Sequence, residues 1–212
     1  MAYFGVRQIF GPLVYRKIRE TKGEENLPPK PPFIIAANHA GFLDAPALVM
    51  YIWHTYNRLT HYITKREFWK LWGGPLARRW MGMIPLNDDR KADSLSEAIK
   101  VLQKQGIVGV FPEGTRNPDP QHLLKGKTGA VRMALATDVP LIPIGLFNTT
   151  GQLIGSAIKG LFEKKSCIRL TIGRMVDLSE FKGRPIDRPL LEAATKKLMV
   201  AIGQLCGKTY PY

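Results

Sequence analysis

The sequence predicts an α/β domain with a central, mostly parallel or mixed sheet flanked by helices and an N-terminal amphipathic helical segment. Short apolar runs rich in β-branched residues, such as 33–37 and 107–111, alternate with stretches of helical periodicity. Both runs end in polar, glycine-containing turns, and α/β sheets carry their chemistry at such strand ends. We therefore expect residues 1–30 to form the amphipathic segment and a linker, and residues 31–212 to form the domain.

Length and composition fit one ordinary globular domain with an unusual charge. The chain has 212 residues, of which 45% are hydrophobic and 23% charged. Its net charge of +14 favours an anionic partner such as nucleic acid, phospholipid headgroups or an acidic substrate. Cys167 and Cys206 do not form a disulfide framework in a chain of this size, which favours a reducing compartment.

The N-terminal segment has the pattern of an amphipathic helix. Residues 3–20 place apolar side chains at helical spacing with basic ones mostly opposite, and Gly11-Pro12 should kink or split the helix. Such a helix fits a membrane interface, and it fits packing on the domain equally well. No apolar run reaches the length of a membrane span, and the first residues do not resemble a signal peptide.

The remaining elements alternate along the chain. We expect a helix after Pro46 and further strands at 59–64, 83–86, 139–146 and 167–172, with helices at 94–104, 130–136 and 189–205 and a basic amphipathic stretch at 152–165. Ser94 and Glu97 have the spacing of a capping box at a helix start, although Asp93 could cap the helix instead. The prolines of 139–146 favour an edge position or the start of that strand.

Aromatic and basic side chains alternate after the second strand. Residues 65–83 hold Trp69, Trp72 and Trp80 among Lys65, Arg66, Lys70, Arg78 and Arg79. This pattern suits a lipid–water interface and also single-stranded nucleic acid, whose bases stack on aromatic rings. A pair of core helices would explain the tryptophans equally well.

The first strand-end turn contains a candidate base. Strand 33–37 runs into Asn38-His39, and Asp44 follows five residues after the histidine. The turn can fold the carboxylate onto the imidazole Nδ1–H, which leaves Nε2 as a base. Alternatively, Asp44 caps the helix that begins before Pro46, and His39 is an ordinary loop residue.

The second strand-end turn contains a candidate phosphate site. Strand 107–111 runs into Pro112-Glu113-Gly114-Thr115-Arg116. The glycine permits a tight turn with exposed backbone amides, and an arginine binds phosphate through two parallel hydrogen bonds. Alternatively, Glu113 and Arg116 form a local ion pair. The sparse histidines and cysteines predict no metal site.

Together these stretches resemble the glycerolipid acyltransferase family, which includes 1-acylglycerol-3-phosphate acyltransferases. The family's Asn-His-x4-Asp motif appears as Asn38-His39 through Asp44, and its Phe-Pro-Glu-Gly-Thr-Arg motif is complete at 111–116. A proline-containing strand at 139–143 matches a further motif. The second motif departs from the family's Ile-Pro-Val-Asp-Arg pattern, because Arg90 arrives two residues late in the run 84–90.

The resemblance implies transfer of a fatty acyl group from acyl-CoA or acyl-carrier protein to the sn-2 hydroxyl of 1-acylglycerol-3-phosphate. The product is phosphatidate, His39 is the general base oriented by Asp44, and no cofactor takes part. The residues that it assigns to substrate binding are Glu113, Gly114, Thr115 and Arg116, with Lys65 and Arg90 as further candidates. It also implies a cytoplasmic protein, peripheral on the inner face of the membrane, that binds the membrane surface through basic aromatic segments and binds no nucleic acid.

Two other functions remain open from the sequence. The acceptor could be another lysolipid, such as a lyso-ornithine lipid. The protein could also be a non-enzymatic basic module that binds nucleic acid or an anionic membrane, since the net charge fits either function. The two strand-end motifs favour the enzyme, because a binding module has no evident need for them.

Overall fold

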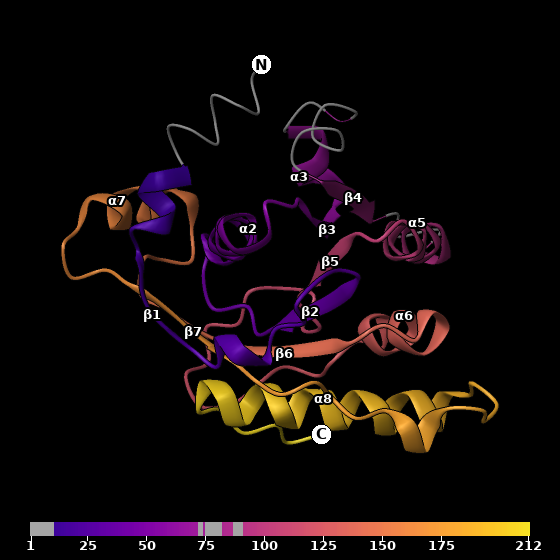
Figure 1. Cartoon of the computed structure of the whole chain (residues 1–212). Helices are drawn as coiled ribbons and strands as arrows, with labels where there is room; N and C mark the ends of the chain where they lie inside the picture. Colours follow the sequence, from indigo (N-terminus) through magenta and orange to yellow (C-terminus); the bar gives the residue numbers. More distant parts are fainter. Residues whose placement is uncertain (1–10, 72–73, 75–81, 87–90) are drawn as a thin grey trace.

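The computed structural model contains one seven-stranded sheet in the order β1-β7-β6-β2-β5-β3-β4 (Figure 1). It describes residues 11–71, 74, 82–86 and 91–212. The strands are β1 (Ile18–Lys22), β2 (Phe33–Ala37), β3 (Thr60–Lys65), β4 (Met83–Leu86), β5 (Ile107–Val110), β6 (Leu141–Asn148) and β7 (Ile168–Ile172). The helices are α2 (Asp44–Tyr56), α3 (Arg66–Leu71), α5 (Lys91–Gln103), α6 (Gly129–Thr137), α7 (Ile154–Phe162) and α8 (Arg188–Cys206), with short 3₁₀ turns at Glu24–Asn26 and Ser179–Phe181.

Strand directions confirm the predicted mixed, mostly parallel sheet. Strands β2 to β6 are parallel to one another, whereas β7 is antiparallel to β6 and parallel to β1. The carboxyl ends of five strands therefore meet at one edge. At the centre, β2 lies between β5 and β6, so the loops that follow β2 and β5 are neighbours. This is where an open α/β sheet binds its ligands.

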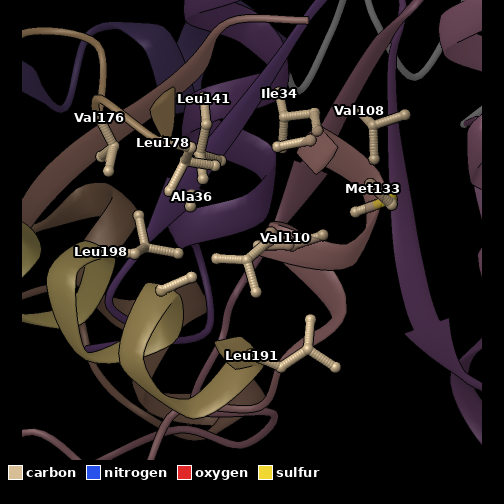
Figure 2. Close-up of a cluster of buried hydrophobic side chains, with 14 of the residues drawn as sticks. Ile34, Ala36, Val108, Val110, Met133, Leu141, Val176, Leu178, Leu191 and Leu198 are labelled. Atoms are coloured by element: carbon tan, nitrogen blue, oxygen red, sulfur yellow. The ribbon is translucent and has the colours of Figure 1, made fainter. Parts of the chain in front are cut away.

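Helices cover both faces of the sheet. In β2, Ile34 and Ala36 point into a cluster closed by α5, α6 and α8, part of which Figure 2 shows. Phe33 and Ile35 point into the opposite cluster, closed by α2 and α7. Because β2 is buried on both faces, its sequence is continuously apolar rather than alternating.

The N-terminal helix ends earlier than its periodicity predicts. Residues 11–15 are helical, but Ile18–Lys22 form the edge strand β1, which pairs with β7. Pairing with β7 outweighs a local helical pattern here, as tertiary contacts often do. Residues 1–10 lie outside the described part. No helix in the described ranges is long and apolar enough to cross a membrane.

Two local predictions are wrong. Strand β6 is central although it contains Pro143, whose carbonyl oxygen accepts a hydrogen bond from Gly173 N at 2.9 Å, just beyond the end of β7. The proline nitrogen, which has no hydrogen to donate, faces the same side, just beyond the Ile144–Ile172 pair at which the β6–β7 register ends. Ser94 does not cap α5, which begins at Lys91; its Oγ donates to Pro85 O at 2.7 Å and joins the helix to β4.

Candidate active site

The loop after β2 holds the side chains of His39 and Asp44 together. Asp44 is the first residue of α2, but it makes no cap bond to the helix. Its Oδ2 instead lies 2.8 Å from His39 Nδ1 and accepts hydrogen bonds from Ala40 N and Gly41 N at 2.6 and 2.7 Å. The helix-cap interpretation of Asp44 is therefore wrong.

This arrangement suits proton transfer at one ring nitrogen. The Asp44 side chain is fully buried, whereas the His39 side chain is 20% exposed. A buried carboxylate on Nδ1 fixes the imidazole tautomer that carries its proton there. His39 Nε2 is then the nitrogen left to accept a proton from a bound hydroxyl group.

Asn148, at the end of β6, supports Asp44 from the neighbouring strand. Its Nδ2 donates to Asp44 Oδ1 at 2.6 Å, and its Oδ1 accepts from Thr150 N and Thr150 Oγ1 at 2.8 and 2.7 Å. A methyl group at Gly41 would lie 2.6 Å from Asn148 Nδ2, so this approach requires glycine. Asn148 was not predicted from the sequence, although its place beside a predicted strand end was a usable signal.

Asn38 extends the sheet beyond its backbone pairing. This buried side chain donates from Nδ2 to Leu146 O at 3.0 Å and accepts from Leu146 N at 2.6 Å. The amide thereby replaces a peptide group in the β2–β6 ladder. It fixes the chain direction one residue before His39.

Glu113 connects the loops after β2 and β5. Its Oε1 accepts from His39 N at 2.9 Å, and its Oε2 accepts from Asn117 Nδ2 and Leu124 N at 2.7 and 3.0 Å. The residue is 4% exposed, so the described chain itself supplies the partners of this buried carboxylate. Asn117 N also donates to His39 O at 2.8 Å, a second bond between the loops that sequence reasoning missed.

A stack of three rings fixes the plane of the imidazole. The rings of His39 and Phe111 lie 4.1 Å apart at 14°, and Tyr62 lies 5.6 Å beyond Phe111. The Tyr62 ring covers Gly109, where any side chain would collide with it. Its hydroxyl is buried without a hydrogen-bond partner in the described structure. Burial, and then the charge of Asp44, hold the pKa of the Tyr62 phenol well above its usual value, so it stays neutral.

The other predicted binding residues differ in exposure. Gly114 has φ of 70°, and its N–H donates to Phe111 O at 2.9 Å, so this amide is already engaged in the turn. Thr115 is exposed. Arg116 is half-buried with its guanidinium carbon 5.5 Å from the centre of the Phe42 ring, which places it against the loop that carries His39.

The remaining candidates lie farther along the same edge or outside the described residues. Lys65 is exposed at the end of β3, on the carboxyl edge of the sheet. Arg90 lies outside the described residues, as do Trp72 and Trp80 of the tryptophan-rich segment.

Comparisons with known proteins agree with these motifs. The profile of the family described as "Acyltransferase" matches residues 18–146, which include both strand-end loops. A 1-acyl-sn-glycerol-3-phosphate acyltransferase from Bacillus subtilis is 32% identical over 186 residues, covering 87% of this chain and 86% of that protein. A protein of the same name from Borreliella burgdorferi is 29% identical over 182 residues, covering 83% of this chain and 70% of its own.

One solved structure extends the similarity to the fold. The crystal structure of the 1-acyl-sn-glycerophosphate (LPA) acyltransferase PlsC from Thermotoga maritima has a TM-score of 0.65 and 25% sequence identity. The alignment covers 96% of this chain and 81% of that one.

Proposed function

The chain belongs to the Acyltransferase family, and on that premise we propose that this acyltransferase converts 1-acylglycerol-3-phosphate to phosphatidate. The acyl group comes from acyl-CoA or acyl-carrier protein and goes to the sn-2 hydroxyl. The observation that carries the proposal is the Asp44 carboxylate 2.8 Å from His39 Nδ1, with the Arg116 loop beside it. Family membership decides against the non-enzymatic binding module.

His39 acts as the general base. Its Nε2 takes the proton of the acceptor hydroxyl as that oxygen attacks the thioester carbonyl carbon. The carbonyl π electrons move to oxygen, and the tetrahedral intermediate collapses with cleavage of the C–S bond. The thiolate leaves and takes up the proton from the imidazolium, so the products are an ester and a free thiol. Asp44 stabilises the imidazolium that forms in between.

Arg116 binds the acceptor's phosphate. Its guanidinium is held against Phe42, and its planar donors match a phosphate with two parallel hydrogen bonds. Gly114 and Thr115 shape the backbone of this turn, and Lys65 and Arg90 are further anion-binding candidates. Glu113 supports the site by holding the His39 and Arg116 loops together. If the Gly114 N–H also stabilises the oxyanion of the tetrahedral intermediate, it must share its hydrogen between that oxygen and Phe111 O.

The substrates place the protein at a membrane surface. Lysophosphatidate and phosphatidate are lipids, so we expect the enzyme to meet them at the surface of a bilayer. We propose a peripheral protein on the inner face of the membrane. The net charge of +14 favours attraction to anionic lipid headgroups.

Product analysis tests the acceptor and the donor. Acyl-CoA and acyl-carrier protein are each offered with lysophosphatidate, with lysophosphatidylcholine and with lyso-ornithine lipid, and the lipid products are identified by mass spectrometry. We expect phosphatidate, formed only when lysophosphatidate is present. Acylation of lyso-ornithine lipid with no phosphatidate would overturn the acceptor while leaving the acyltransferase in place.

A further inference from the structure

Helix α7 exposes a row of large apolar side chains. Ile154, Ile158 and Phe162 follow one another at four-residue spacing and are 52%, 53% and 73% exposed. Leu153, just before the helix, is 70% exposed. We call these four residues the α7 stripe. An amphipathic helix on a globular protein normally turns its polar side to water, and a contiguous exposed apolar row marks an interaction surface.

The stripe is not a core face that has failed to pack. A separate side of α7, formed by Ala157, Gly160 and Leu161, is buried against the domain. At Gly160 a side chain would collide with the backbone of Thr150, so the helix lies directly on that loop. Figure 1 shows α7 at one side of the molecule, apart from α5, α6 and α8. The buried side fixes the stripe toward solvent.

Both ends of α7 are held in place. At the carboxyl end, Lys17 Nζ donates to Glu163 O at 2.6 Å and Arg19 donates to Lys164 O at 3.3 Å. At the start, Ser156 Oγ bonds the backbone of Leu153, at 3.2 Å from its N and 2.9 Å from its O. The stripe is thus a preformed surface that needs little ordering when it binds.

The same helix borders the candidate active site. Gly151 O, just before α7, accepts from Phe42 N at 3.0 Å in the loop that carries His39. Thr150, on which α7 lies, bonds Asn148, which in turn bonds Asp44. A surface bound by the stripe therefore lies next to the loop that carries His39, the residue that would deprotonate the acceptor.

Exposed basic residues lie within and directly after the helix that carries the stripe. Lys159, Lys164 and Lys165 are exposed, and the one acidic residue of this segment, Glu163, lies 3.7 Å from Lys159. Apolar side chains bordered by lysines are the pattern of a helix that lies in the surface of an anionic bilayer. Nucleic acid would leave the apolar row unused.

We propose that the α7 stripe inserts into the headgroup–acyl boundary of an anionic phospholipid bilayer and holds the active-site loop at the membrane. This proposal rests on the proposed function, since it places a lipid acceptor beside His39. It names a different contact from the tryptophan-rich segment 65–83, in which Trp72 and Trp80 lie outside the described residues.

Flotation of the full chain with phosphatidylglycerol–phosphatidylethanolamine vesicles tests the proposal. The test variant is Ile158→Glu/Phe162→Glu, and the control is Met175→Glu/Ile186→Glu, which adds the same charge at side chains 57% and 55% exposed. Met175 follows β7, which is antiparallel to β6, so it lies at the opposite sheet edge from α7. Because all four side chains are exposed, thermal unfolding should match the wild type.

We expect the α7 variant to bind vesicles about 100-fold more weakly than the wild type, from the loss of two buried apolar side chains. The vesicle affinity of the control variant should stay within about fivefold of the wild-type value. Equal losses in both variants would show that net charge alone attracts the protein and would overturn the proposal, as would unchanged binding of the α7 variant. A wild-type dimer that the α7 variant dissociates would show that a second copy occupies the stripe.

Flotation measures binding without turnover, so the two proposals fail separately. A protein that binds vesicles through α7 but acylates no lysophosphatidate would overturn the function and retain the contact. If the α7 variant makes phosphatidate and binds vesicles as well as the wild type does, the proposed function is retained and the membrane contact of α7 is overturned.

Discussion

Replacing Asp44 by asparagine tests the hydrogen bonds around the candidate base. The carboxylate accepts three bonds at Oδ2 and one at Oδ1, the latter from Asn148 Nδ2 at 2.6 Å. An amide cannot accept at both ends. If its oxygen keeps the bonds to Ala40 and Gly41, its NH₂ faces the NH₂ of Asn148.

That conflict lowers the free energy of unfolding by about 2 kcal/mol, the usual cost of a buried donor left unpaired. In a chain of this size it lowers the unfolding midpoint by about 4–8 °C. The charge opposite the imidazolium is also lost. An equivalent change in a catalytic triad lowers kcat about 10⁴-fold, and we expect a loss of about 10³–10⁴-fold here. Calorimetry measures the first effect and thiol release from acyl-CoA the second.

A charge swap separates the two effects. In Asp44→Asn/Asn148→Asp, the new amide at 44 donates to the new carboxylate at 148, which still accepts from Thr150. We expect the unfolding midpoint to recover and the activity to remain low. Asn148→Asp alone places two carboxylates side by side and should be the least stable of the three. A swap no more stable than Asp44→Asn, or Asp44→Asn activity within about tenfold of wild type, would refute the reasoning.

Three further substitutions test other contacts of the site. Asn38→Ala leaves the buried N–H and C=O of Leu146 unpaired, and urea denaturation should show a loss of about 2–6 kcal/mol in the free energy of unfolding; a loss below about 1 kcal/mol would contradict it. Phe111→Leu removes the ring stacked on His39 and should lower kcat by about 2–10-fold with the acceptor KM unchanged; a change in KM alone would contradict the positioning role. Arg116→Ala should raise the acceptor KM far more than the acyl-CoA KM, with partial recovery in Arg116→Lys, whereas an unchanged acceptor KM would remove Arg116 from the phosphate site.

Sequence patterns predicted the site contacts that form within one short segment of the chain. His39 and Asp44 lie five residues apart in one turn, so their meeting depends only on that turn. The run 111–116 follows its strand directly, and alternation of strands and helices sufficed to predict the sheet. Periodicity also predicted most of the helices, because each buries one side against the sheet.

Contacts that depend on strand order could not be predicted in the same way. Asn148 reaches Asp44 across 104 residues only because β6 lies beside β2, and single-strand patterns do not encode which strands become neighbours. The same holds for the bond between Glu113 and His39 N, which needs β5 on the other side of β2. Pro143 in the central strand and the strand at 18–22 were mispredicted for this reason, because both depend on where β7 begins and ends.

Thiol release from an acyl-CoA, or from acyl-carrier protein, tests the central claim most directly. The wild type and His39→Ala are compared with and without lysophosphatidate, and circular dichroism confirms that both are folded. We predict release that requires both lysophosphatidate and His39, because the acceptor hydroxyl is the nucleophile and the imidazole its base. A folded His39→Ala protein that transfers the acyl group at the wild-type rate would contradict the account.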